Sequence, residues 1–385
     1  MIVLINQFST PLFVDVVNAF QEEGQEEVRY ITGGSEIRHL KVKDGVKIVP
    51  SISYKRSNLL TRLITWLGFS LHACLYLAFC KRPSAVVVVT NPPFAPWVVS
   101  MLSRFRKYPF YLVIYDLYPD VLQQAGMMRP DHIIYRLWQR RNPKVFARAQ
   151  KIITLSDSMK AAAANYTAGD TEKILVIHNW ASDPGSRVGR DDNPFAAEHN
   201  LNGRLVVLYA GNMGLTHDLE SLMEAAVFLK DYDAIRFVFV GDGGKKKTLE
   251  GIRDRHHLDN VLFLPYLDGD RFTQALAAAD IGVVTLGAGA EGISVPSKTY
   301  VNMAAGLCLL AIAPKESELA RIVQGHNVGV LVEPSHPDKV ADTILHLHRN
   351  PDVLARFKAQ AKKASEGFTR RNAWEYVKVV GTPTE

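Results

Sequence analysis

The sequence predicts an α/β protein built from two doubly wound parallel-sheet domains. Its 385 residues exceed what one ordinary hydrophobic core organises. Short apolar strand patterns alternate with helical patterns through both halves, which is typical of βα units around a parallel sheet. We expect an N-terminal domain over residues 1–185, a polar, turn-rich linker over 186–202, a second domain over 203–368, and a C-terminal helix and tail over 369–385.

The first domain is expected to contain six strands. Ligands of parallel sheets bind at the carboxyl ends of strands, so the loops T-N-P-P-F-A-P and Y-D-L-Y-P-D, after the third and fourth strands, are the candidate binding loops. The predicted strands are Ile2–Ile5, Val28–Thr32, Ala85–Thr90, Phe110–Ile114, Lys151–Leu155 and Ile174–Ile177.

An uncharged run over Leu63–Phe79 is close to the lower length limit for crossing a bilayer. Strand patterns of the same domain lie on both sides of it, so a membrane-spanning helix would divide that domain. The run is compatible with a transmembrane helix, a buried core helix, or a helix lying in the membrane interface beside the preceding arginines. Trp66 and Trp97 would lie at a headgroup boundary in the last case, although aromatic residues at helical spacing are more often core.

A second series of strand and helix patterns predicts a second doubly wound sheet. The final helical segment, Thr369–Val379, is amphipathic, and we expect it to cross back and pack on the first domain. The predicted strands are Leu205–Ala210, Arg236–Gly241, Val261–Leu264, Ile281–Thr285, Cys308–Ala313 and Val328–Val332.

The charge of the chain is unevenly distributed. Residues 1–180 contain 22 Lys and Arg against 13 Asp and Glu, and no acidic residue occurs between Asp44 and Asp116. Such a basic surface suits an anionic membrane, a diphosphate-bearing substrate or nucleic acid, and the lack of a nucleic-acid-binding motif disfavours the last.

The cysteines and the first residues bear on the compartment. Cys74, Cys80 and Cys308 have neither metal-ligand spacing nor a disulfide pattern, which suits a reducing environment and excludes zinc or thiol chemistry. The chain enters a strand pattern at Ile2 without a basic segment or cleavage site, so we expect no signal peptide.

The stretch E-G-I-S-V-P-S-K-T-Y-V-N-M-A-A-G, residues 291–306, predicts a strand-to-helix turn followed by a helix. Pro296 is typical of a helix start, and Ser297 is expected to cap it. A helix N-terminus attracts anions, and Lys298 adds a full charge beside it, which indicates a diphosphate site. The alternative is an ordinary capped helix with a solvated lysine.

Three further loops are expected at the same sheet edge. Gly211 and Gly214 permit close approach of backbone to a phosphate, or simply a tight turn. V-G-D-G-G-K-K-K places glycines before three lysines, Pro265 and Tyr266 could form a slot for a base, and the Glu291 carboxylate could hold sugar hydroxyls. Nicotinamide, flavin and P-loop chemistry are disfavoured because their glycine and lysine motifs are absent.

In their order and spacing these motifs resemble those of glycosyltransferase family 4, the retaining sugar-nucleotide enzymes of two-domain GT-B architecture. The resemblance is closest to the branch that builds bacterial capsule, O-antigen or exopolysaccharide, and it covers nearly the whole chain. It rests on T-N-P-P, I-Y-D-L-Y-P-D, L-S-D-S-M, V-I-H-N-W, Y-A-G-N-M-G-x-x-H-D-L, F-V-G-D-G, P-S-K-T-Y and M-A-A-G.

The resemblance implies roles for particular residues. Catalytic roles fall to Asp116 near the acceptor, to Glu291 at the donor sugar, and to Lys298 at the leaving diphosphate. The donor nucleotide would be bound by Gly211, Asn212, His217, Gly241, Asp242, Gly243, Pro265, Tyr266, Gly292, Ile293, Ser294 and Ser297. The acceptor side would comprise Ser9, Thr10, Asn91, Tyr115 and Asp120.

The chain departs from the family pattern at several positions. Asn212 and His217 stand where the family commonly has Arg and Lys, so Lys298 is expected to supply the positive charge. Ile293 and Val301 stand where its paired glutamates fall, which leaves Glu291 as a near match and a ribose-binding carboxylate missing. Tyr115 replaces a histidine before Asp116, and Ser9 and Thr10 replace a glycine pair.

From the sequence we therefore expect a retaining glycosyltransferase that moves a sugar from a nucleotide-diphosphate donor, UDP more than GDP, to a lipid-diphosphate-linked saccharide. No cofactor or metal is expected, because helix dipole and lysine can neutralise the leaving group. Partners are the donor, the lipid-linked acceptor and an anionic membrane surface, with no nucleic acid, and the location is the cytoplasmic face of a bacterial plasma membrane. The rival interpretations are a sugar-nucleotide 2-epimerase and a non-catalytic homologue that acts as a scaffold.

Overall fold

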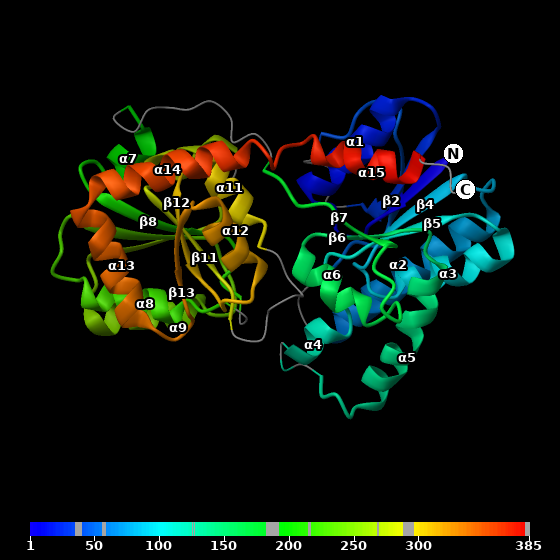
Figure 1. Ribbon diagram of the computed structural model, residues 1–385, viewed down its shortest axis with the longest axis horizontal. Helices are drawn as coiled ribbons and strands as arrows, with labels where there is room; N and C mark the ends of the chain where they lie inside the picture. Colours follow the sequence, from blue (N-terminus) through cyan, green and yellow to red (C-terminus); the bar gives the residue numbers. More distant parts are fainter. Residues whose placement is uncertain are drawn as a thin grey trace. The chain divides into compact units, whose positions relative to one another are not determined.

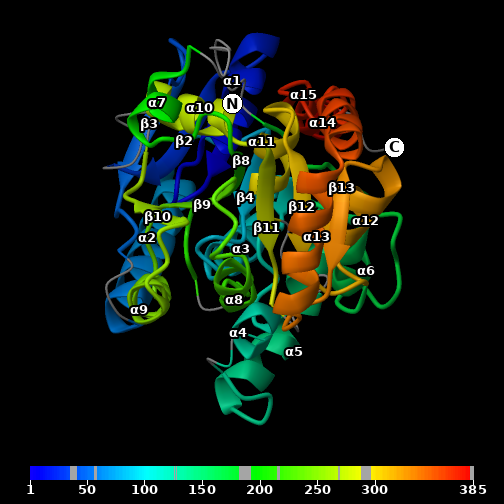
Figure 2. The ribbon, with the colours of Figure 1, turned by 90° about the vertical axis from the view of Figure 1, so that its left-hand side faces the viewer.

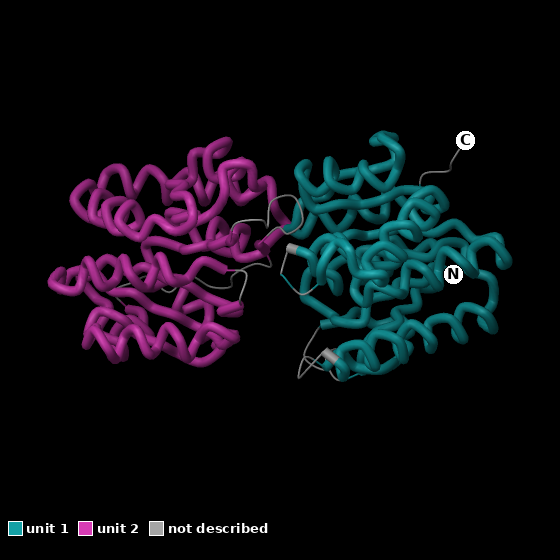
Figure 3. Tube along the Cα trace, turned by 90° about the horizontal axis from the view of Figure 1, so that it is seen from below, with its two compact units in different colours: residues 1–179, 292–294, 370–385 teal, residues 180–291, 295–369 magenta. Residues whose placement is uncertain are grey.

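The chain forms two compact α/β units in the computed structural model (Figure 3). Among the described residues, unit 1 comprises 1–179 and 370–381, and unit 2 comprises 180–369. The structure describes residues 1–34, 41–55, 59–124, 126, 128–181, 192–214, 217–267, 269–287 and 296–381.

Unit 1 contains a seven-stranded parallel sheet in the order β3-β2-β1-β4-β5-β6-β7. The six predicted strands are confirmed, and a seventh, β3, was not predicted. β3 is an exposed edge strand with Pro50 inside it, so its sequence lacks the apolar run that marks a buried strand. The strands are β1 Ile2–Ile5, β2 Val28–Gly33, β3 Lys47–Ser51, β4 Ala85–Val89, β5 Phe110–Val113, β6 Ile152–Thr154 and β7 Ile174–Val176.

Helices cover both faces of this sheet. α1 and α15 pack together on one face, and α2, α3 and α5 lie on the other (Figure 1). The helices of unit 1 are α1 Pro11–Glu23, α2 Leu59–Phe79, α3 Ala95–Arg106, α4 Asp120–Gln124, α5 Ile133–Arg148, α6 Asp157–Ala164 and α15 Asn372–Gly381.

The apolar run of the first domain forms α2. Leu60–Phe79 is the one helix of the described chain that is long and apolar enough to cross a membrane, with mean hydropathy 1.3 and 33% of its window buried. α2 connects β3 to β4 of one sheet and buries Phe69, Ala73 and Leu77 in unit 1. Trp66 is buried as well, in an aromatic cluster, which contradicts a headgroup position for it.

Unit 2 contains a six-stranded parallel sheet in the order β10-β9-β8-β11-β12-β13. All six predicted strands are confirmed, and β8, β11 and β12 run side by side in Figure 2. In the register of β8 and β9, Leu205 lies opposite Ile235. The strands are β8 Leu205–Ala210, β9 Ile235–Val240, β10 Val261–Leu264, β11 Ile281–Thr285, β12 Cys308–Ile312 and β13 Gly329–Val332.

The core of unit 2 has one layer on each side of the sheet. α8, α9 and α13 bury residues such as Met223, Leu249 and Ile344 on one face, and α7 and α10 bury Phe195 and Leu276 on the other. The helices of unit 2 are α7 Pro194–Glu198, α8 Glu220–Phe228, α9 Lys246–His256, α10 Gly269–Ala278, α11 Lys298–Ala304, α12 Glu318–His326, α13 Pro337–Arg349 and α14 Pro351–Ser365.

Residues 192–202, which the sequence analysis assigns to the linker, are part of unit 2 in the structure. Asn193 caps α7 by accepting hydrogen bonds from the backbone N–H groups of Phe195 and Ala196, and its side chain donates to Gln274 O at 2.8 Å. Phe195 is buried against α10. Two buried apolar side chains, Phe195 and Leu201, and one cap therefore anchor a stretch whose composition is typical of a loop.

The C-terminal helix packs on the first domain, as the sequence predicts. Arg370 forms ion pairs at 3.0 Å with Asp15 and Glu22 of α1. The Tyr111 hydroxyl of β5 donates to Val380 O at 3.2 Å. In Figure 1 α15, in red, lies alongside α1, in dark blue, so the two ends of the chain stabilise the same unit.

Candidate functional site

Glycines gather where β8 and β9 end, at the carboxyl edge of the unit 2 sheet. Gly211, Gly241 and Gly243 have φ angles of 131°, 130° and 150°, which L-residues rarely adopt. A Cβ at position 243 would lie 2.5 Å from Met213 O, and one at position 241 would clash with Gly211 O. The glycines therefore let the two loops pack backbone against backbone, and the Met213 N–H donates to Asp242 O at 2.8 Å across them.

Lys298 reaches this pair of loops from the start of α11. Its ammonium donates to the Tyr209 hydroxyl at 2.6 Å and lies 4.0 Å from the centre of the same ring. A Cβ at position 211 would lie 2.5 Å from Lys298 Cε, so Gly211 makes room for the lysine. Burial lowers the pKa of Lys298 to about 7. No carboxylate within the described residues pairs with it.

His217 lies beside Lys298, on the loop that follows β8. Burial, and then the nearby charge of Lys298, lower the pKa of its imidazole to about 4, so the ring is neutral at pH 7. Its Nδ1 is buried and accepts from no group of the described chain. The neutral ring can therefore accept or donate one hydrogen bond toward a ligand, but it cannot replace the positive charge of a family lysine.

A second lysine, Lys245, approaches the same loop from the start of α9. The sequence analysis did not distinguish it from the other two lysines at that helix start. Lys245 donates to His217 O at 2.6 Å and pairs with Glu220 at 2.7 Å. Lys246 donates to Gly241 O at 3.3 Å. Both lysines thus hold loop backbone in place, and Glu220 already neutralises one of them.

The remaining donor-side residues of unit 2 are more exposed. Asn212 and Asp242 lie at the surface, and the Asp242 carboxylate accepts from the Gly243 N–H at 2.8 Å. Tyr266, beside Pro265 just after β10, is exposed, and its hydroxyl donates to Asp242 O at 3.4 Å. The loops after β8, β9 and β10 therefore meet at one edge, as the sequence predicts.

The predicted Ser297 cap is not formed. Ser297 has helical φ and ψ angles of −61° and −22°, and its side chain accepts no capping hydrogen bond. Because the turn preceding α11 keeps Ser297 in helical conformation, its hydroxyl cannot fold back onto the next N–H groups. Glu291, Gly292, Ile293 and Ser294 lie outside the described residues.

In unit 1, Asp116 lies three residues after the end of β5, at the carboxyl edge of the sheet. Burial raises the pKa of its carboxyl group to about 6, although the side chain keeps partial solvent access. The Thr90 hydroxyl of the neighbouring strand end accepts from the N–H groups of Tyr115 and Asp116, at 3.2 and 3.4 Å. Asp116 is therefore held at a fixed place, with a pKa near the range in which a carboxylate can act as a base.

The other predicted acceptor residues make internal hydrogen bonds. Ser9 bonds the hydroxyls of Tyr30 and Thr32 at 2.6 and 2.5 Å. Thr10 caps α1 by accepting from the Phe13 N–H at 3.3 Å. Asp120 accepts from the Tyr166 hydroxyl at 2.6 Å and from Gln139 Nε2 at 3.3 Å. These contacts give each side chain a role in holding the fold.

Two asparagines at this edge hold buried polar atoms with no partner in the described chain. They are both amide atoms of Asn6, after β1, and Oδ1 of Asn91, after β4. The Gln7 N–H donates to Asn91 O at 3.2 Å, which joins the two loops. Asn91 was predicted and Asn6 was missed. The available signal for Asn6 in the sequence was its position directly after a buried strand. In the structure its side chain stands out because unpaired buried amides are rare without a ligand or water.

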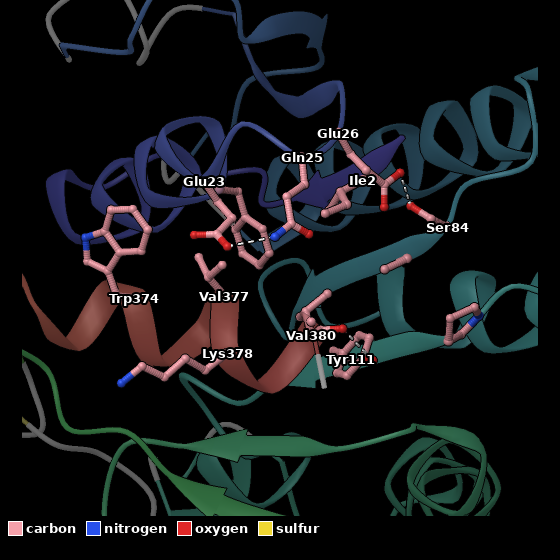
Figure 4. A pocket seen from close by; sticks show the side chains of 14 residues that line it. Ile2, Glu23, Gln25, Glu26, Ser84, Tyr111, Trp374, Val377, Lys378 and Val380 are labelled. Atoms are coloured by element: carbon pink, nitrogen blue, oxygen red, sulfur yellow. Dashed lines mark hydrogen bonds between the residues drawn. The ribbon is translucent and has the colours of Figure 1, made fainter. Parts of the chain in front are cut away.

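A pocket of about 750 Å³ lies at the opposite, amino-terminal ends of β1 and β4, between α1 and α15 (Figure 4). It is lined by Ile2, Glu23, Gln25, Trp374 and Val377 among others, and by none of the predicted site residues. The figure shows Gln25 turned toward Glu23, to which its amide donates at 3.0 Å. The described residues contain no group of three potential metal ligands.

The second unit matches a known family. Residues 191–364 match the family model of glycosyl transferases group 1. Two curated relatives bear glycosyltransferase names. The chain is 28% identical over 268 residues to the "Probable glycosyltransferase WbjE" of Pseudomonas aeruginosa, covering 69% of this chain and 66% of the relative. It is 29% identical over 187 residues, 48% of this chain and 46% of the relative, to the "Putative colanic acid biosynthesis glycosyl transferase WcaI" of Escherichia coli K12.

Solved structures share the fold along the whole chain. Sucrose-phosphate synthase from Thermosynechococcus elongatus superposes with a TM-score of 0.77 at 15% identity, over 98% of this chain and 97% of that one. HepE of Anabaena, solved with UDP-glucose, gives 0.73 at 16% identity over 98% of both chains. The fold is therefore GT-B. The matched parts span about two thirds and about half of the curated relatives.

Proposed function

We propose that the protein is a retaining glycosyltransferase that transfers a sugar from a nucleotide-diphosphate donor, UDP-linked in preference to GDP-linked, to a lipid-linked saccharide of bacterial surface polysaccharide synthesis. The group 1 domain and the relatives with glycosyltransferase names support the sugar transfer. The UDP-glucose in the HepE structure supports the choice of a uridine donor. Donor and acceptor are assigned to units 2 and 1 respectively.

The observation that carries this proposal is the buried amine of Lys298, which bonds the Tyr209 hydroxyl and pairs with no carboxylate among the residues described. Burial lowers the pKa of Lys298 to about 7, because protonating a buried amine without a counterion costs free energy. A diphosphate placed at the carboxyl edge of β8 and β9 would supply that counterion. Gly211 gives the phosphate oxygens access to backbone, and the neutral His217 can add a hydrogen bond without a competing charge.

Transfer then depends on charge stabilisation within unit 2. As the bond between the anomeric carbon and the diphosphate oxygen breaks, negative charge develops on the leaving group, and protonated Lys298 stabilises it. Glu291, expected at the donor sugar, would hold its hydroxyls. The acceptor hydroxyl attacks from the face that the diphosphate leaves, which retains the anomeric configuration. No metal ion is required in this scheme, since the ammonium carries the compensating charge.

In unit 1 the proposal assigns the acceptor to the edge that contains Asp116. A carboxylate with a pKa of about 6 is ionised at pH 7 and can accept the proton of the acceptor hydroxyl. The unpartnered amide atoms of Asn6 and Asn91 are placed to bond saccharide hydroxyls. A lipid-linked acceptor would place the enzyme at the cytoplasmic face of the plasma membrane, in agreement with the basic first half of the chain.

The test is binding of nucleoside diphosphates to the purified chain, measured as a shift in melting temperature with UDP, GDP, CDP and dTDP. Binding to the folded state raises the melting temperature by mass action. A shift with UDP in the presence of EDTA, lost in Lys298→Ala and retained in Lys363→Ala, is the expected result. Lys363 is an exposed lysine of α14 and serves as the matched control. The absence of a shift with every nucleotide at millimolar concentration would overturn the proposal and favour a non-catalytic homologue.

A further inference from the structure

A continuous apolar ridge runs along the outer side of α2. It consists of residues spaced by three or four positions, which places them on one side of the helix. Their exposed fractions lie between 50% and 84%. The ridge is formed by Leu60, Ile64, Leu67, Leu71, Leu75 and Phe79.

Neighbouring elements extend the ridge into a patch. α3 packs beside α2 and adds exposed Met101 and Phe105, one helical turn apart. On the other side, Ile52 follows the edge strand β3 and contacts α2 so closely that a Cβ at Gly68 would lie 2.5 Å from its Cδ1. Soluble proteins rarely expose so many large apolar side chains in one continuous area without a partner.

One end of this patch is strongly basic. Arg106 donates to Ala78 O and Cys80 O, both at 2.6 Å, and thereby joins the carboxyl ends of α2 and α3. The exposed basic side chains around this shared end are Lys81, Arg82, Arg104 and Lys107. No acidic residue occurs in the sequence between Asp44 and Asp116. Glu27, which directly precedes β2, forms ion pairs with Arg29 and Lys47.

We propose that this α2–α3 patch is the surface by which unit 1 docks on an anionic bilayer, with α2 lying in the plane of the interface. The aliphatic ridge would enter the acyl boundary, and the four basic side chains would contact lipid phosphates. The inference deepens the proposed function, because it assigns the membrane contact to particular residues. The inference also selects the interfacial helix from the three alternatives for Leu63–Phe79. The inner side of α2 is buried on the sheet of unit 1, so the helix cannot leave that sheet to span a membrane.

The charge pattern favours a bilayer over a protein partner. A partner protein would have to present a long apolar groove with acidic residues at one end only. A bilayer of anionic lipids offers an apolar interior and a negative surface along every direction, and it needs no such match of shape. A second copy paired in parallel is disfavoured because it would bring eight basic side chains together without intervening carboxylates, and an antiparallel dimer is one outcome that the experiment detects.

The experiment is co-sedimentation of the full chain with vesicles. Vesicles of phosphatidylglycerol and phosphatidylcholine in equal parts are compared with vesicles of phosphatidylcholine alone. Leu67→Ser with Leu71→Ser should lower the partition coefficient on the anionic vesicles by about tenfold or more. Phe228→Ser, which changes an exposed apolar residue of unit 2, should leave it unchanged. Lys81→Gln with Arg104→Gln should lower the partition coefficient by about tenfold, and high salt should have the same effect on the parent. The control, Lys339→Gln with Lys363→Gln, should leave the partition coefficient unchanged.

Three outcomes would overturn the inference. The chain could fail to bind anionic vesicles, the α2 variants could bind like the parent, or the parent could elute as a dimer that Leu67→Ser with Leu71→Ser converts to a monomer. The melting shift with UDP is measured on the same samples and reports on unit 2 alone. A chain that responds to UDP and ignores vesicles therefore refutes the docking surface without refuting the transferase proposal.

Discussion

The two sheets of this protein present the same kind of edge with different chemistry. Both are parallel, and in both the loops after the central strands gather at the carboxyl ends. In unit 2 that edge consists of glycine backbone and a buried lysine that pairs with no carboxylate of the described part of the chain. In unit 1 it consists of side chains that bond one another, together with the Asp116 carboxylate, whose pKa is raised to about 6, and amide atoms of Asn6 and Asn91 that have no partner among the described residues.

The difference shows how one architecture can bind two kinds of ligand. A diphosphate is compact and highly charged, so it is best bound by closely approaching backbone and a fixed positive charge. A saccharide is neutral and rich in hydroxyl groups, so it is best bound by amides and a carboxylate in a rigid frame. The predictions below test whether each edge has the role that its chemistry suggests.

The largest effect is expected for Lys298→Ala. Loss of the charge that stabilises the leaving diphosphate should lower kcat by about 10²–10³-fold. The matched control is Lys363→Ala, which should retain the parent rate. Steady-state assays with a UDP-sugar and a membrane extract measure both variants. A Lys298→Ala enzyme with an unchanged kcat would remove the distinction between the two edges.

Asp116→Asn should lower transfer by about 10²-fold while the affinity for UDP stays constant, because the amide cannot take up the acceptor proton. Asp120→Asn is the contrasting variant. Since Asp120 accepts hydrogen bonds from Tyr166 and Gln139, its substitution should lower the free energy of unfolding by on the order of 1 kcal/mol. Urea unfolding together with UDP titration separates the two results. Equal losses of stability in both variants would make Asp116 a structural residue too.

Gly241→Ala should destabilise unit 2 by about 2 kcal/mol, because its φ of 130° is unfavourable for alanine and the new methyl group would clash with Gly211 O. The control is Gly251→Ala in α9, where no atom lies within 4 Å of the added carbon. That variant should be neutral or more stable by up to about 1 kcal/mol, since alanine favours a helix. Thermal unfolding checks the pair, and equal melting temperatures would contradict the close packing of the two loops.

The smallest effect is a pH dependence of UDP affinity. The pKa of Lys298 is about 7 in the free protein, and a bound diphosphate should raise it, so binding takes up a proton above pH 7. Affinity should then fall with rising pH above 7, by at most about tenfold per pH unit. Lys298→Arg should remove this dependence because its guanidinium stays charged. Calorimetric titration with UDP above pH 7 measures the affinity of the parent and of Lys298→Arg. Parallel pH profiles of the two proteins would show that a group other than Lys298 titrates.

Much of the fold could be predicted from the sequence, because a buried parallel strand requires a run of apolar residues. Twelve of the strands follow that rule, whereas β3 does not, since an edge strand with Pro50 is exposed and carries no such run. The loops that meet at the unit 2 edge were also predictable, because the sequence changes from apolar residues to glycine and polar residues directly after β8 and β9, a change typical of the binding loops of parallel sheets.

Only the tertiary structure decided how the individual side chains are used. Ser9 and Asp120 looked like binding residues, yet their partners come from other elements that no local pattern reveals. Thr10 instead caps the helix that follows it, which is a local use of its hydroxyl. Burial by the surrounding fold lowers the pKa of Lys298, and no neighbouring residue in the sequence predicts it. Local sequence determines which backbone elements form, but hydrogen bonding and desolvation depend on what the fold brings near, and these settle which polar groups remain for a ligand.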